Sequence, residues 1–123
     1  MRTINPEELG APRGYANGLL APAGCSLLFV AGQIGWDRDQ KIVSEEFIDQ
    51  FDQALRNVVA VVQEAGGEID HLGRLTIYVT DKSEYLADLQ DLGRVYRRIM
   101  GRHFPAMNRQ NSDCTGLDTS VPI

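Results

Sequence analysis

Helical periodicity is the clearest pattern in the chain. Between residues 47 and 65, apolar side chains recur every three or four positions and would line one side of a helix. Ser44 suits the N-cap of this helix, and two glutamates follow it in the first turn, where the helix dipole favours negative charge. Gly66 and Gly67 follow, and glycine tolerates the left-handed backbone conformation with which helices commonly end. The pattern predicts one long amphipathic helix over residues 45–65. Its apolar positions are Phe47, Phe51, Ala54, Leu55, Val58, Val59, Val62 and Ala65.

A strand pattern and a second helical pattern follow. Residues 74–80 alternate between apolar and polar or mixed side chains, which predicts a strand with one apolar face. Asp81 and Glu84 have the spacing of a capping box. They open a predicted helix that continues to Gly101, where the absence of a Cβ again favours a helix end. The apolar side of this helix carries Tyr85, Leu89, Leu92, Tyr96 and Ile99.

The first third of the chain predicts a β-hairpin. Residues 26–34 begin with an uninterrupted apolar run, which is typical of a strand covered on both faces. Residues 15–21 are the preceding strand, joined to it by a turn at residues 22–25. Residues 1–13 are polar, contain two prolines and are expected to form a surface arm.

These elements predict an α+β fold. Their order is strand, strand, helix, strand, helix, and two helices of this size cover only one face of a small sheet. We therefore expect one two-layer domain over residues 1–123. The opposite face of the sheet needs cover that the chain does not supply, so we expect identical subunits to associate there.

Charge and cysteine content narrow the function classes. The 123 residues carry a formal net charge of −5 at pH 7, which argues against a dedicated nucleic-acid binder. Arginines at positions 94, 97, 98 and 102 lie on the second predicted helix, where a solvated polar face is the simpler interpretation. Cys25 and Cys114 are too few for a disulfide framework and lack the spacing of a metal site.

No targeting or membrane segment is apparent. The N-terminus lacks the apolar core of a signal peptide, and no stretch approaches the ~20 apolar residues that a membrane span needs. We therefore expect a soluble protein in the reducing cytoplasm.

An ordered set of short motifs resembles one known family. The chain reads Gly32-Gln33, then Gln50 through Gln53-Ala54-Leu55-Arg56-Asn57, Glu64-Ala65-Gly66-Gly67, Leu75-Thr76-Ile77-Tyr78-Val79-Thr80-Asp81, Tyr96 and Phe104-Pro105-Ala106. The order and spacing over about residues 14–107 are similar to those of the RidA/YjgF family, also called the endoribonuclease L-PSP family.

The resemblance implies a fold, an assembly and an activity. The fold is chorismate-mutase-like, with a mixed sheet and two helices packed on one face, and the assembly is a homotrimer with three ligand clefts between subunits. The activity is hydrolysis of small enamines and imines, such as 2-aminoacrylate, to a keto acid and ammonia. A small-molecule substrate is then the partner, and the chemistry needs no metal or organic cofactor.

Four candidate site residues follow from the resemblance in the first third of the chain. Tyr15 matches a cleft tyrosine that hydrogen-bonds water or substrate, although an aromatic strand residue that packs on a neighbour is an equal alternative. Gly32 matches the glycine whose surroundings present main-chain groups to the ligand. Ala31 stands where the family usually has serine. Gln33 is either a cleft residue or an amide that pairs with backbone.

The C-terminal part departs from the family. Met107 replaces an arginine that holds the substrate carboxylate, and methionine cannot do this. Arg109 would share a face of a strand with Met107, so it is either a substitute cation or a solvated side chain. Residues 108–123 lack alternating apolar positions and the usual glutamate. Asp113 and Asp118 are either substitute acids or surface carboxylates.

Three functions remain open from the sequence. The first is an enamine/imine deaminase, with Tyr15, Gly32 and Arg109 as candidate catalytic residues. The second is a non-catalytic trimer that binds a small metabolite, which the loss of the arginine and the glutamate favours. The third, a ribonuclease, is disfavoured by the acidic charge.

Overall fold

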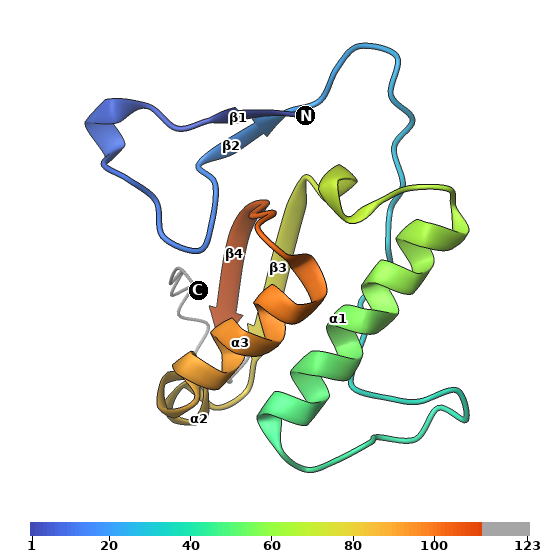
Figure 1. The fold of residues 1–123 in the computed structure, drawn as a ribbon. Coiled ribbons are helices and arrows are strands. Elements are labelled where there is room, and N and C mark those ends of the chain that lie inside the picture. The colour runs from blue at the N-terminus through green and yellow to red at the C-terminus, as the bar shows by residue number, and fades with distance from the viewer. Residues whose placement is uncertain (112–123) are drawn as a thin grey trace. The chain divides into compact units, whose positions relative to one another are not determined.

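The computed structural model describes residues 1–111, and it combines short strands with three α-helices (Figure 1). In chain order the elements are strand β1 (Arg2–Ile4), 3₁₀-helix η1 (Glu7–Leu9), β2 (Gly18–Leu20), α1 (Phe47–Glu64), 3₁₀-helix η2 (Ile69–His71), β3 (Arg74–Val79), α2 (Lys82–Ala87), α3 (Leu89–Met100) and β4 (Ala106–Asn111).

The chain forms two compact units, each built from separate stretches of sequence. The first unit contains Met1–Cys25, Asp70–Ala87 and the stretch that begins at His103. The second contains Ser26–Ile69 and Asp88–Arg102. The single domain over residues 1–123 stays a prediction.

The first unit holds two pairs of strands. β1 and β2 are antiparallel, with Arg2 opposite Leu20, so the predicted N-terminal arm is in fact partly a strand. β3 and β4 are parallel, with Arg74 opposite Ala106. An isolated parallel bridge joins Ala16 to Ala106, and the Ala16 N–H donates to the Pro105 carbonyl at 3.1 Å. β4 therefore has backbone partners on both of its sides.

β3 confirms the strand expected over residues 74–80. Arg74 and Tyr78 are exposed, whereas Val79 is buried. The Asp81 side chain accepts hydrogen bonds from the Ser83 and Glu84 N–H groups at 2.9 and 3.2 Å, as a helix N-cap does. The first turn of α2 is stabilised in this way.

The second predicted helix is wrong as a single element. α2 ends at Ala87 and α3 begins at Leu89, with Asp88 between them at φ −103° and ψ 16°. Aspartate is unfavourable in the interior of a helix and common at the first residues of one. The periodicity of the apolar side chains does not reveal such a break. Gly101 does end α3 with a positive φ of 63°.

β4 extends through sequence that showed no strand pattern. Residues 108–111 pair with Thr76 to Val79 although they are polar, so part of the atypical tail continues the sheet by backbone pairing. Asp113 and Asp118 lie outside the described residues.

In the second unit, α1 confirms the long helix. Its buried side chains are Phe51, Leu55, Val59 and Val62, and Gly66 follows it with φ +86°. The N-terminus differs from the prediction, because Glu46 is the N-cap and has no side-chain capping bond. Ser44 lies two residues earlier and its Oγ accepts from the Glu46 N–H at 3.0 Å.

The predicted hairpin is wrong. Residues 26–34 form no strand, and β2 pairs with β1 instead. Leu27 and Phe29 are 80% and 88% exposed, so this apolar run is not covered on both faces within the chain. A continuous apolar run indicates only that burial of its side chains is favourable. It does not specify which segment pairs with it or covers it.

The chain passes very close to α1 at Gly35. A Cβ added at this buried glycine would lie 2.5 Å from Gln50 Cα and 2.9 Å from the Gln50 carbonyl oxygen. Nearby, the Val43 N–H donates to the Gly35 carbonyl at 2.9 Å, and Trp36 pairs with Ile42. The absence of a side chain at position 35 therefore lets residues 34–36 lie against the helix.

We expect Gly35→Ala to destabilise the protein by about 1–3 kcal/mol, because the new methyl group meets helix backbone that cannot rotate away. Urea unfolding followed by circular dichroism measures this as a lower midpoint. Gly32→Ala is the matched control, since its Cβ would meet nothing within 4 Å. Equal midpoints for the two variants would contradict the close approach at Gly35.

Candidate functional site

The Gly32 segment, residues 31–33, is open to solvent. Ala31 and Gly32 are exposed, and Gln33 is half-buried. The Gln33 Nε2 donates to the Ala31 carbonyl at 3.2 Å, which folds this side chain back on its own backbone. Space around Gly32 is empty to 4 Å from a notional Cβ, so a ligand can reach its main chain.

Several main-chain groups of the Gly32 segment have no protein partner. Within residues 1–111, neither the N–H groups of Ala31, Gly32 and Gln33 nor the carbonyls of Gly32 and Gln33 are hydrogen-bonded. Consecutive free N–H groups attract anions and polar ligand atoms where the backbone conformation makes them converge. The segment therefore offers a small set of unused donors and acceptors next to a residue without a side chain.

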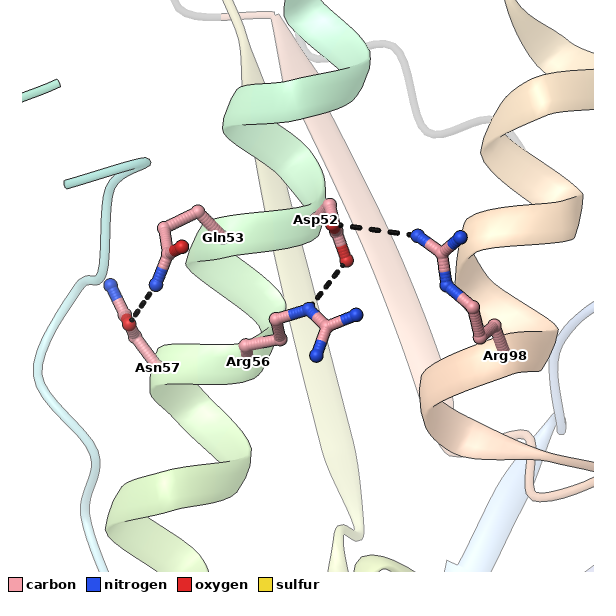
Figure 2. Close-up of polar contacts among 5 residues, drawn as sticks. All are labelled: Asp52, Gln53, Arg56, Asn57 and Arg98. Carbon is pink, nitrogen blue, oxygen red and sulfur yellow. Dashed lines mark hydrogen bonds and ion pairs between the residues drawn. The ribbon is translucent and has the colours of Figure 1, made fainter. Parts of the chain in front are cut away.

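An asparagine on α1 holds the chain directly after this segment. The Asn57 Nδ2 donates to the carbonyls of Ile34 and Trp36, both at 3.1 Å. Its Oδ1 in turn accepts a bond from the Gln53 Nε2 at 2.9 Å, as Figure 2 shows. Both amide hydrogens of Asn57 and its carbonyl oxygen are thus engaged, so its orientation is fixed.

A different side of α1 carries an ion-pair group. The Asp52 carboxylate accepts from Arg56 Nε at 2.9 Å and pairs with Arg98 of α3 at 3.4 Å (Figure 2). The arginine side chains are 52% and 60% exposed, so solvent screens these contacts and each stabilises the fold little. On α3 itself, Arg94 pairs with Asp91. Both Arg94 and Arg98 are thus exposed and paired with aspartates.

Tyr15 and Met107 lie on two neighbouring segments of the first unit, one on each side of a bridge along the chain direction. Tyr15 immediately precedes Ala16, Met107 immediately follows Ala106, and these two alanines form the parallel bridge. Both Tyr15 and Met107 are half-buried. The backbone of Arg109 lies two residues further along β4, opposite Ile77.

The predicted site residues thus fall into two groups. Tyr15, Met107 and Arg109 belong to the first unit, and the Gly32 segment belongs to the second. Sequence reasoning did not give Asn57 a role. A signal existed, because an asparagine four residues after Gln53 lies off the apolar stripe of α1.

Further features of residues 1–111 concern metal ligands, membrane-spanning helices and shifted pKa values. No group of three or more histidine, cysteine, aspartate or glutamate side chains within residues 1–111 is placed to hold a metal ion. No helix in that part of the chain is long and apolar enough to cross a membrane. Burial raises the pKa of the Tyr96 hydroxyl on α3 by desolvation, so this tyrosine stays neutral well above physiological pH.

Comparison with known proteins gives relatives with a shared family name. A RutC family protein of Aquifex aeolicus is 30% identical over 96 residues, which cover 78% of this chain and 72% of that protein. A RutC family protein of Pyrococcus horikoshii is 32% identical over 82 residues, 66% of this chain and 62% of that protein. The match therefore spans less than two thirds of some relatives.

Solved structures agree in fold. A Rid-family protein of unknown function from Yersinia pestis, YyfB, superposes with a TM-score of 0.78 at 25% identity and covers 94% of this chain and 88% of its own. Escherichia coli TdcF, solved with bound serine, has a TM-score of 0.61 at 26% identity and covers 90% and 84%. The α+β fold of the RidA/YjgF proteins is thereby confirmed.

The family profile described as Endoribonuclease L-PSP matches residues 9–119, nearly the whole chain. Together with the RutC relatives and the Rid-family structures, this match shows that the chain belongs to the endoribonuclease L-PSP family, also known as the RidA/YjgF family.

Proposed function

We propose that the protein is an enamine/imine deaminase that hydrolyses a small reactive metabolite of the 2-aminoacrylate type to a keto compound and ammonia. The observation that carries the proposal is the Gly32 segment, whose three main-chain N–H groups and whose carbonyls at Gly32 and Gln33 have no partner within residues 1–111. Such groups hold a small polar substrate without a long side chain. Family membership supports the same interpretation.

The proposed ligand is a small amino or keto acid. Escherichia coli TdcF, a structural relative, was solved with bound serine, which has the size and the carboxylate of 2-aminoacrylate. The free N–H groups of the Gly32 segment suit such a carboxylate, because backbone donors lose little entropy when they bind an anion.

The proposed reaction is balanced by one water. The methylene carbon of 2-aminoacrylate gains a proton as the enamine becomes an imine, water adds to the imine carbon, and the carbon–nitrogen bond breaks to release ammonia and pyruvate. In this scheme the main-chain groups of the Gly32 segment bind and orient the substrate. The Tyr15 hydroxyl hydrogen-bonds the water or the substrate. No cofactor takes part in this scheme.

A non-catalytic metabolite-binding protein is the second candidate. Met107 favours it, since a thioether cannot form the charge-assisted bonds by which a guanidinium grips a carboxylate. In the deaminase scheme Arg109, two residues along β4, is the substitute cation. The ribonuclease interpretation has less support, because the chain has a net charge of −5 and nucleic-acid binding depends on positive charge.

We also propose a cytoplasmic homotrimer with the ligand cleft between subunits. The side chains of Leu27, Leu28 and Phe29 support association, because three successive exposed apolar residues favour burial against a protein partner. A second and third copy of the chain are the partners that the family resemblance implies.

Gly32→Val tests the activity and its site together. Wild-type protein is expected to release pyruvate and ammonia from freshly generated 2-aminoacrylate faster than buffer does. The variant is expected to lose at least about tenfold in kcat/KM, because the added side chain displaces the substrate from the main chain. Ser26→Val, in the same exposed stretch, is the control that should retain wild-type activity. A wild-type rate equal to buffer would remove the deaminase proposal.

Met107→Arg separates the deaminase from the binding protein. A restored guanidinium is expected to lower KM for 2-aminoacrylate about tenfold, the worth of one charge-assisted bond pair. Met107→Leu, which conserves volume, should change little. Pyruvate-dependent stabilisation in thermal melts without turnover, in both wild type and Met107→Arg, would favour the non-catalytic alternative.

Sedimentation equilibrium tests the trimer. Wild type is expected at three times the chain mass of 13.6 kDa. Phe29→Lys should shift the distribution toward single chains, since a charge in an apolar interface is costly to desolvate. Leu9→Lys is the control, because Leu9 is also exposed, at 62%, but lies in η1. A folded wild-type monomer would contradict the assembly.

A further inference from the structure

Asn57 has hydrogen bonds that neither the core nor helix stability requires. It lies in the middle of α1, where the backbone N–H and carbonyl groups are already satisfied within the helix, and it is not among the buried side chains of that helix. Asparagine is also a poor helix former, so its presence costs stability there relative to alanine. Its amide instead serves another segment of the chain.

The bonds of Asn57 fix the direction of the backbone after the Gly32 segment. Its two donors hold the carbonyls of Ile34 and Trp36, and the Val43 N–H holds the carbonyl of Gly35 between them. Three successive carbonyls are therefore paired, while the main-chain N–H groups of residues 31–33 remain unpaired within the described chain. The paired carbonyls of residues 34–36 thus follow directly after the unpaired N–H groups of residues 31–33.

Gln53 fixes which end of the Asn57 amide faces the segment. The Gln53 Nε2 donates to the Asn57 Oδ1 (Figure 2). The Asn57 Nδ2 is therefore the end of the amide that points to the carbonyls at 34 and 36. Asp52 and Arg56 point to the side of α3 and do not take part, so the neighbouring polar residues of α1 provide internal controls.

We propose that Asn57 is a positioning residue for ligand binding: it holds the carbonyls of Ile34 and Trp36 and thereby aims the free main-chain groups of the Gly32 segment at the substrate. This inference rests on the proposed function for its ligand. The positioning itself concerns only the backbone of residues 31–36.

Asn57→Asp is the most direct test, since it conserves size and replaces both N–H donors by a carboxylate that faces two carbonyl oxygens. At pH 7.5 we expect pyruvate to bind at least about tenfold more weakly than to wild type, the ratio expected for loss of a partly buried hydrogen bond. As the pH is lowered toward 5, protonation of the introduced carboxyl group restores one O–H donor. Pyruvate affinity should therefore recover in the variant and not in wild type, which a purely structural defect would not produce.

Two further variants complete the test. Gln53→Met removes the bond that orients the Asn57 amide, and it should weaken pyruvate binding in the same direction by a smaller factor, which keeps the test decisive if the aspartate variant does not fold. Arg56→Met is the matched control on a different side of α1, and it should bind pyruvate like wild type.

Backbone amide exchange measured by NMR separates this inference from the proposed function. Shifted backbone resonances for Gly32 to Trp36 are expected in Asn57→Asp and Gln53→Met, but not in Arg56→Met. Faster exchange is expected for the Trp36 N–H, which donates to the Ile34 carbonyl at 2.8 Å in wild type. If wild type binds no pyruvate, the deaminase and binding proposals fail and the exchange data alone decide the role of Asn57. Unchanged exchange, or pyruvate affinity within twofold of wild type in both variants, would overturn the inference.

Discussion

The bonding of one side-chain amide to two carbonyl groups is the constraint on which the candidate site depends. Asn57 holds the irregular backbone of residues 34–36 in place along α1. Gly35 permits this contact because it has no side chain to separate the backbone from the helix. Irregular backbone usually leaves polar groups to water. Here the carbonyls from Ile34 to Trp36 are paired, and the N–H groups of residues 31–33 are free within the described chain. The paired carbonyls fix the backbone next to these N–H groups and so limit the directions in which they can point.

The sequence predicted those elements whose own side chains determine them. α1 buries a regular stripe of its own residues, and the alternating side chains of β3 end in the buried Val79, so periodicity reports both elements directly. Residues 26–34 and the α2–α3 break were predicted wrongly, because their outcome depends on pairing with another segment or on one local backbone conformation at Asp88. The part of β4 beyond Met107 was not predicted for the same reason. Its pairing with β3 uses backbone hydrogen bonds, which form with polar as well as apolar side chains.

The candidate site was predictable only in part. Family motifs predicted Gly32 and Tyr15 as site residues, and the replacement of the family's arginine by Met107 was visible in the sequence. The role of Asn57 was not, because a hydrogen bond between residues 57 and 34 spans 23 positions and leaves no periodic trace. Long-range polar contacts of this kind are fixed by the fold, whereas the sequence shows only that a polar residue lies off the apolar stripe.

In the proposed deaminase, the replacement of the family's arginine by Met107 gives main-chain N–H groups a larger share of anion binding. A guanidinium offers a full charge on a flexible stem, and its affinity for a carboxylate tolerates small errors of position. Main-chain N–H groups carry only partial charge, so they match a guanidinium only if several converge with the correct geometry. In this proposal a chain with methionine at position 107 depends more on the rigidity of its Gly32 segment, and the bonds from Asn57 are among the described contacts that hold the residues directly after it.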